Sequence, residues 1–298
     1  MAIKISTEQQ PRRIARSAAL TVLSTGSLML AGCTIGDVAE DIPVDVTSSE
    51  VGPEPTRGGV ASEENNTNSG EITVTDLQDM ALPDTAIAVA GVGSTQEVNV
   101  PAWSTIKVPL SIAAVRDGSA DMGALTSAIT VSDNAAAEQL WEGLGQPEGA
   151  AEKVERVLSE GGVQTQVNAQ VTRPGFSAFG QTMWTTEGQA TFASHLQCLE
   201  GAQAVVEAMG SIAGGQNYGL GQISGALYKG GWGPNESGVY GVRQFGLLPR
   251  GDGTLAAVAI AAVSPDGSYE SGQAQLNQLA QKLSERAADL PAAECSGS

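Results

Sequence analysis

A serine and a lysine three residues apart are the first candidates for chemistry in this sequence. Ser104 and Lys107 occur in the phrase S-T-I-K, and the apolar run that follows predicts a buried helix over 104–116 with the serine at its start. Residues three apart lie on one helical face, so the lysine can reach the hydroxyl, while free amides at the helix start favour an oxyanion. Because burial lowers the pKa of a lysine, the pair predicts a serine nucleophile with a lysine base.

Two further motifs follow along the chain. The phrase S-D-N at 132–134 predicts the start of a helix over 134–144, and K-G-G at 229–231 lies at the end of a strand predicted over 225–230. Taken singly, each motif has an ordinary interpretation, because Ser and Asp cap helices and glycine pairs mark turns and strand ends. Their order, two helix starts and then a strand end, favours one shared active site.

In this order the three motifs resemble the S-x-x-K, S-D-N and K-T-G motifs of the class A β-lactamases and the penicillin-binding proteins. The resemblance covers about residues 84–290. It implies a serine nucleophile, a lysine base, a serine that relays a proton to the leaving nitrogen and an asparagine that holds a substrate amide. The residues that it assigns to catalysis are Ser104, Lys107, Ser132, Asn134 and Lys229.

The resemblance also implies an oxyanion hole, made by the backbone N–H groups of Ser104 and Trp232. Gly230 and Gly231 would be substrate-binding residues at the last two positions of K-T-G. In the family, the residue at the position of Gly230 has a hydroxyl that binds the substrate carboxylate. Because Gly230 has no hydroxyl, we expect weaker β-lactam binding or a different ligand. Arg243, on the next predicted strand, is a candidate replacement for that anion contact.

The loop that carries the water-activating glutamate in class A β-lactamases departs from the family pattern. The phrase W-T-T-E at 184–187 resembles the start of the helix after that loop, which places the loop at 171–183. These residues include no Asp or Glu, and Glu187 falls at the helix start, where it favours the helix. Without a carboxylate to activate water, we expect the acyl-enzyme to hydrolyse slowly.

The first residues predict export and lipidation. A basic segment precedes an apolar run over 18–31 that is too short, and too rich in Ser and Gly, for a permanent membrane span. The run ends in L-A-G-C, which resembles a bacterial lipobox with Cys33 as the lipidated residue. Residues 1–32 are thus expected to be the signal peptide of a bacterial, actinobacterial-type lipoprotein, anchored to the outer side of the cell membrane. The alternative is an ordinary signal peptide that ends near a cysteine.

An acidic tether is expected to follow the signal peptide. Residues 33–71 hold nine acidic residues, one arginine and three prolines, so they cannot bury enough apolar surface to fold. The folded domain is expected over 72–298. With Cys33 lipidated, Cys198 and Cys295 remain as a candidate disulfide in an oxidising compartment, and two separate thiols are the alternative.

Composition argues against several other functions. The formal net charge is -18 and no basic stripe follows the first residues, which disfavours nucleic acid as a partner. One histidine, His195, and three cysteines leave no expected metal site, and neither a G-x-S-x-G elbow nor a Gly-rich phosphate loop occurs. We expect no cofactor. The expected partners are a small-molecule or peptidoglycan-type substrate and, through the lipid, the membrane.

The elements that must position these residues are two strands, a helical block, three strands and a final helix. Strands from both ends of the domain can share one antiparallel sheet, flanked by helices, with an all-helical insertion over about 117–212. The fold class is therefore α/β and β-lactamase-like. The strands are predicted over 85–92, 97–100, 225–230, 237–248 and 254–263, and the further helices over 148–160, 185–199 and 202–209 and along the apolar stripe from Leu276 to Leu290.

Two functions follow from this pattern. The first is a serine acyl-enzyme of the cell envelope, acylated at Ser104 by a β-lactam or a peptidoglycan-type amide and slow to release the acyl group. The second is a non-catalytic lipoprotein of the same fold that binds an envelope ligand or a protein partner. The altered third motif and the loop without a carboxylate favour the second, and the ordered set of motifs favours the first.

Overall fold

The structure, a computed structural model, describes residues 70–293. The predicted signal peptide, nearly all of the tether, and Cys33 and Cys295 lie outside the described residues. None of the helices within that range is long and apolar enough to cross a membrane. The helices are α1 (Val74–Met80), α2 (Lys107–Asp117), α3 (Met122–Thr130), α4 (Asn134–Gly143), α5 (Pro147–Glu160), α6 (Thr186–His195), α7 (Gln203–Met209) and α8 (Tyr269–Glu285).

Five strands form one antiparallel sheet in the order β2-β1-β5-β4-β3. The first two strands precede the helical block and the other three follow it. The sheet therefore joins the two ends of the domain, as the sequence predicts. The strands are β1 (Thr85–Val89), β2 (Gly93–Ser94), β3 (Leu227–Pro234), β4 (Tyr240–Pro249) and β5 (Leu255–Val263).

The sheet is buried on both faces, which explains why its strands are apolar almost throughout. Successive side chains of a strand point to opposite faces. In β4, Phe245 and Leu247 belong to the hydrophobic core cluster shared with the helical block, whereas Val242 and Leu248 belong to the cluster beneath α8. By the same alternation, Lys229, Gly231 and Gly233 of β3 lie on the face of the sheet toward the helical block.

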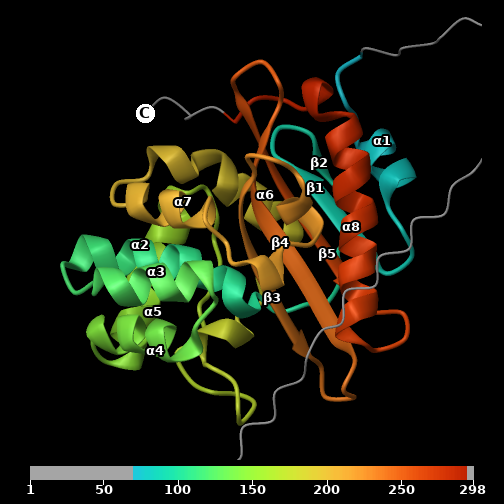
Figure 1. Cartoon of the computed structure of the whole chain (residues 1–298). Coiled ribbons are helices and arrows are strands. Elements are labelled where there is room, and N and C mark those ends of the chain that lie inside the picture. The colour runs from blue at the N-terminus through green and yellow to red at the C-terminus, as the bar shows by residue number, and fades with distance from the viewer. Residues whose placement is uncertain (1–69, 294–298) are drawn as a thin grey trace, which may run out of the picture. The chain divides into compact units, whose positions relative to one another are not determined.

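Helices cover the sheet on both sides (Figure 1). The figure shows α8 along one side, near α1, and the group α2–α5 with α7 on the other side. α6 lies within the predicted insertion over 117–212, but it packs against β1, β4 and β5. One helix of that range thus belongs to the layer that covers the sheet.

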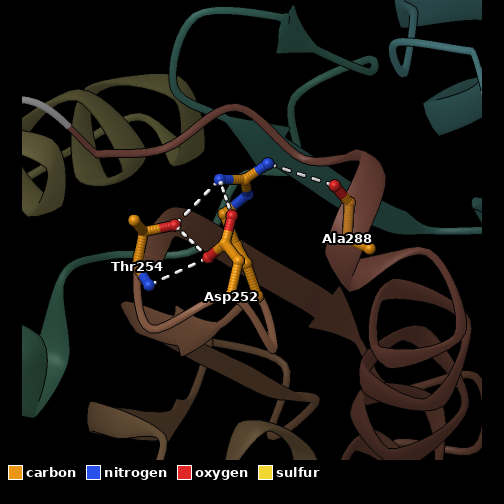
Figure 2. Close-up of polar contacts among 4 residues, drawn as sticks. Asp252, Thr254 and Ala288 are labelled. Carbon is orange, nitrogen blue, oxygen red and sulfur yellow. Dashed lines mark hydrogen bonds and ion pairs between the residues drawn. The ribbon is translucent and has the colours of Figure 1, made fainter.

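The turn over 250–254 joins β4 to β5. The Asp252 carboxylate accepts hydrogen bonds from the Thr254 amide at 2.9 Å and from the Arg250 guanidinium at 2.8 Å. Arg250 also donates to the backbone carbonyl of Ala288 at 3.1 Å. These contacts tie the tip of the hairpin to the segment after α8 (Figure 2).

The structure corrects several predicted elements. The second strand is β2 rather than a strand over 97–100, and the Glu97 carboxylate instead accepts hydrogen bonds from the amide and hydroxyl of Thr186 at the start of α6. The predicted helix over 104–116 begins as a 3-10 turn, Trp103–Ile106, before α2. α1 and α3 were not predicted, because each is short and its apolar period is weak, although a capping box at Thr73 marks the start of α1.

Candidate active site

A pocket of about 790 Å³ lies where the helical block meets β3. The 3-10 turn and α2, the turn before α4, α4 itself, the loop before α6 and β3 all contribute to its walls. It therefore lies at the junction of the two parts of the fold, where ligands commonly bind. Its lining includes Trp103, Ser104, Lys107, Ser132, Asn134, Glu138, Trp141, Glu142, Pro147, Trp232 and residues of the loop over 169–180.

The candidate nucleophile lies on a strained turn. Trp103 has a φ of +48°, which a bulky L-residue rarely adopts and which costs on the order of 1–3 kcal/mol. The Trp103 ring is buried and packs on Phe176, with 5.2 Å between ring centroids. With its predecessor held in this way, Ser104 is half-buried and lines the pocket. Its exposure meets the first requirement for a nucleophile.

The backbone of β3 approaches the nucleophile turn closely at Gly231. A Cβ added at this glycine would lie 2.7 Å from the carbonyl oxygen of Ala102 and 2.8 Å from the amide nitrogen of Ser104. Real Cβ atoms do not come so close to backbone atoms. Gly231 is therefore the residue that permits β3 to lie against the turn, and it acts through its backbone rather than by lining the pocket.

Lys107 is buried, with 2% of its surface exposed, and its ammonium group is fully engaged with the turn before α4. The Nζ atom donates to the carbonyl oxygen of Ser132 at 2.7 Å and to Oδ1 of Asn134 at 2.8 Å. It also lies 3.2 Å from the carbonyl oxygen of Asp133 and 3.5 Å from the Ser132 hydroxyl. The first two motifs of the sequence are thus in direct contact.

The Ser132 hydroxyl connects the second motif to the third. Nζ of Lys229 donates to this hydroxyl at 3.0 Å and to the carbonyl oxygen of Gly230 at 2.9 Å. Ser132 has a φ of +58°, a left-handed conformation in which both its carbonyl and its hydroxyl face the lysines. The structure therefore brings together four of the predicted catalytic residues, and Ser104 lies beside them in the pocket lining.

Burial is the main cause of the altered pKa of each lysine. It lowers the pKa of Lys107 to about 8, while the charges of Asp133 and Glu138 oppose this shift. It lowers the pKa of Lys229 well below the usual value, and the charge on Lys107 lowers it further. Burial is the cause that the sequence analysis expected, and it makes Lys107 a candidate for a base near neutral pH.

Arg243 does not line the pocket, so its expected role as a substrate anion contact does not fit the structure. It is fully buried on the face of β4 that points to α6, because residue 243 pairs with Gly231 in the sheet. Its guanidinium donates to Oε1 of Gln189 at 3.0 Å and to the carbonyl oxygen of Val100 at 2.6 Å. Gln189 in turn donates to the Thr105 hydroxyl at 2.7 Å. Arg243 therefore braces the turn that carries the nucleophile.

The other predicted substrate-binding positions are divided between the two faces of β3. A side chain at Gly230 would point away from the helical block, with its Cβ 3.4 Å from the Tyr218 hydroxyl. Neither Gly230 nor Lys229 lines the pocket. Trp232 does, and its ring stacks on Tyr269 with 5.4 Å between centroids. Because β3 is an edge strand, alternate amides of its backbone point away from β4.

The loop over 171–183 contributes apolar and neutral residues to the pocket, in agreement with its lack of Asp and Glu. Gln181 holds the loop internally: its Oε1 accepts from the Thr172 hydroxyl at 2.6 Å and from the Arg173 amide at 2.7 Å. Two carboxylates that the sequence analysis did not select, Glu138 and Glu142, line the pocket from α4. Their spacing from Asn134 at i+4 and i+8 was the signal that could have indicated them.

The remaining candidates lie elsewhere. His195 ends α6 and does not line the pocket. Cys198 is disulfide-bonded, and its predicted pairing with Cys295 stays a prediction because residue 295 lies outside the described range. Within residues 70–293 no cluster of three or more His, Cys, Asp or Glu side chains could hold a metal ion.

No family model and no curated protein matches the sequence. Among solved structures, TLA-3 extended-spectrum β-lactamase matches with a TM-score of 0.58 and 12% identity, covering 73% of this chain and 100% of that chain. A class A β-lactamase from Bacteroides cellulosilyticus matches with a TM-score of 0.55 and 14% identity, covering 69% and 92%. A mutant of PBP-A, as an acyl-enzyme complex with penicillin G, matches with a TM-score of 0.53 and 19% identity, covering 72% and 97%.

The chain has a β-lactamase-like fold. The structural neighbours are β-lactamases and a penicillin-binding-type protein, and the five-stranded antiparallel sheet with helices on both sides agrees with theirs. The low sequence identities limit this conclusion to the fold. The chemistry of the pocket depends on the contacts, burial and charge of its own residues.

The close approach at Gly231 predicts a large effect for one added methyl group. We expect Gly231→Ala to lower the free energy of unfolding by about 1–3 kcal/mol, because the new Cβ would overlap backbone atoms of the nucleophile turn. Gly230→Ala is the matched control, since its Cβ would meet only side-chain atoms at 3.4 Å or more. Urea denaturation of both variants measures the difference, and equal midpoints would contradict the assignment.

Proposed function

We propose that this protein is a serine acyl-enzyme of the cell envelope that accepts the acyl group of a β-lactam or a peptidoglycan-type amide on Ser104. The observation that carries the proposal is the Ser132 hydroxyl, which contacts the ammonium groups of both Lys107 and Lys229 beside the nucleophile. A serine that only caps a helix does not need two buried lysines in contact with its hydroxyl. A serine that passes protons between a nucleophile and a leaving group does need such contacts.

In the proposed reaction, neutral Lys107 removes the proton of the Ser104 hydroxyl as its oxygen attacks the carbonyl carbon. The tetrahedral intermediate then expels the amide nitrogen, which takes the proton of the Ser132 hydroxyl while Lys107 returns its proton to that hydroxyl, 3.5 Å away. Lys229, which donates to the same hydroxyl, keeps Ser132 oriented for that transfer. Lys107 and the Ser132 hydroxyl lie 3.5 Å apart and line the pocket together with Ser104, which supports general acid–base catalysis at this serine.

The substrate would be held by backbone and amide groups. Asn134 already uses its Oδ1 to accept from Lys107, so the group that it offers to a substrate is its NH₂. The backbone N–H groups of Ser104 and Trp232 are proposed to stabilise the oxyanion, because Gly231 brings the two backbones together. The rings of Trp103, Trp141 and Phe176 in the lining favour a substrate with an apolar acyl part.

A non-catalytic binding role is the second candidate, and one observation favours it. Lys229 is fully buried and Arg243 braces the interior, so neither offers a positive charge to a substrate carboxylate. Lys107 is the only cationic residue among those that line the pocket in the described part of the chain. Recognition of an anionic β-lactam is therefore expected to be weaker than in the family that the motifs resemble.

Acylation of Ser104 distinguishes the two candidates. We expect the domain from residue 70, incubated with penicillin G, to gain the mass of one penicillin, because Lys107 lines the same pocket as Ser104 and burial lowers its pKa to about 8. Intact mass spectrometry measures the adduct, and Ser104→Ala, with the same fold, is the control. If wild-type protein and the alanine variant both stay unmodified with every β-lactam tested, the binding role replaces the enzymatic one.

The pKa of Lys107 predicts the pH dependence of that acylation. Only the neutral amine can accept the serine proton, and this lysine has a pKa of about 8. The acylation rate should therefore rise with pH and level off above about pH 8. Single-turnover rates measured from about pH 6 to about pH 10 check this expectation. A rate that falls as pH rises through this range would exclude Lys107 as the base.

We propose that Cys33 carries a lipid that anchors the protein to the outer side of the cell membrane, with residues 33–71 as the tether. The support is the L-A-G-C phrase after the apolar run and the acidic composition that follows it. Cys33→Ala should move the protein from the membrane fraction to the soluble fraction of a bacterial host. An unchanged distribution after fractionation would contradict lipidation at this residue.

A further inference from the structure

The pocket holds two carboxylates, and both come from α4. Glu138 and Glu142 line it, whereas the loop over 169–180 that faces them contributes none. They are the only acidic residues among the lining residues in the described range. If a carboxylate of the pocket activates a water molecule, it is one of these two glutamates.

Glu138 is the nearer of the two to the catalytic lysine. It lies four residues after Asn134, whose Oδ1 is 2.8 Å from Nζ of Lys107. Side chains at i and i+4 share one helical face, with about 5–6 Å between their Cβ atoms. The Glu138 carboxylate is also close enough to Lys107 for their charges to interact. Glu142 is one further turn away and is exposed.

The surroundings of Glu138 also suit a base. The side chain is half-buried between α4 and the pocket. Burial raises its pKa, the charge of Glu142 raises it further, and the charge of Lys107 opposes the shift. A carboxylate with a raised pKa accepts a proton more readily at a given geometry. These three charged groups are the titratable residues that line the pocket.

We infer that Glu138 is the general base that activates water for hydrolysis of the Ser104 acyl-enzyme, taking from α4 the role that the loop cannot fill. This inference rests on the proposed function. The carboxylate takes one proton from water as the water oxygen bonds to the ester carbonyl carbon. The tetrahedral intermediate then breaks its bond to Oγ of Ser104, which recovers a proton from the Glu138 carboxyl group. The products are a carboxylic acid and the free serine.

The geometry allows another use of the same carboxylate, which is to hold a cationic group of the substrate. The two uses differ in the step that they affect. A group that binds a substrate cation changes how fast the serine is acylated and at what concentration. A base for water changes only how fast the acyl group leaves. Measuring the two steps separately therefore decides between them.

The experiment follows acylation and release in the domain from residue 70 with penicillin G as the probe. Glu138→Gln keeps the size and hydrogen-bonding groups of the side chain but cannot accept the proton. Glu152→Gln is the matched control, because Glu152 lies exposed on α5 and does not line the pocket. Acylation is timed by intact mass, and release is timed after excess penicillin has been removed. Thermal unfolding of each variant checks that the fold is retained.

We expect Glu138→Gln to slow release by on the order of 10²-fold or more, the usual contribution of a general base, and to leave the acylation rate within about twofold. Glu152→Gln should leave both rates nearly unchanged. Hydroxylamine, which attacks an ester without a base, should release the acyl group from wild type and from the Glu138 variant at similar rates.

Three outcomes would overturn the inference. Equal release rates in wild type and Glu138→Gln would remove Glu138 from the hydrolytic step while the adduct itself still supports the acyl-enzyme. A loss of acylation with unchanged release would assign Glu138 to substrate binding. If no variant forms an adduct with any β-lactam tested and none of them hydrolyses the β-lactam, the proposed function and this inference fail together.

Discussion

Two buried lysines that share one serine hydroxyl are the constraint on which the rest of the candidate active site depends. An ammonium group loses its hydration on burial, and two of them so close together also repel each other. Carbonyl oxygens of Ser132, Asp133 and Gly230 offset this cost by accepting hydrogen bonds from the lysines, and burial lowers the pKa of both lysines. The same burial that makes the arrangement costly makes Lys107 a candidate base.

The architecture around the lysines holds a strained backbone in place. Both turns of the candidate site hold a residue in the left-handed conformation, Trp103 before the candidate nucleophile and Ser132 before α4. Such conformations persist only when the surroundings determine them. Here β3 presses against the first turn at Gly231, and a buried chain of hydrogen bonds from Arg243 through Gln189 reaches Thr105. An arginine that the sequence suggested as a ligand contact is instead part of this support.

The charges of the pocket differ from what the motifs alone lead one to expect. Its lining offers one cation, partly neutralised by burial, and two carboxylates from α4. A substrate with a strongly anionic group near the third motif would find no positive side chain there, and a neutral or cationic group would be better accommodated. The carboxylates of the pocket therefore lie on the face of α4 that continues from Asn134. The loop before α6, which is held by its own internal hydrogen bonds, contributes none.

Much of the fold and part of the candidate site could be predicted from the sequence alone. Apolar runs long enough to be buried, and motifs at helix starts and on a strand, are local properties, so S-T-I-K, S-D-N and K-G-G and the joining of strands from both ends of the domain were recoverable from the sequence. The face of the sheet to which each side chain points could not be predicted from the sequence, because a shift of one residue in register reverses the face. The observed register places Arg243 in the interior. Only the tertiary structure could bring Lys229 to Ser132, 97 residues apart in the chain, and add Glu138 to the pocket, because such proximity is set by packing between distant segments and leaves no local pattern.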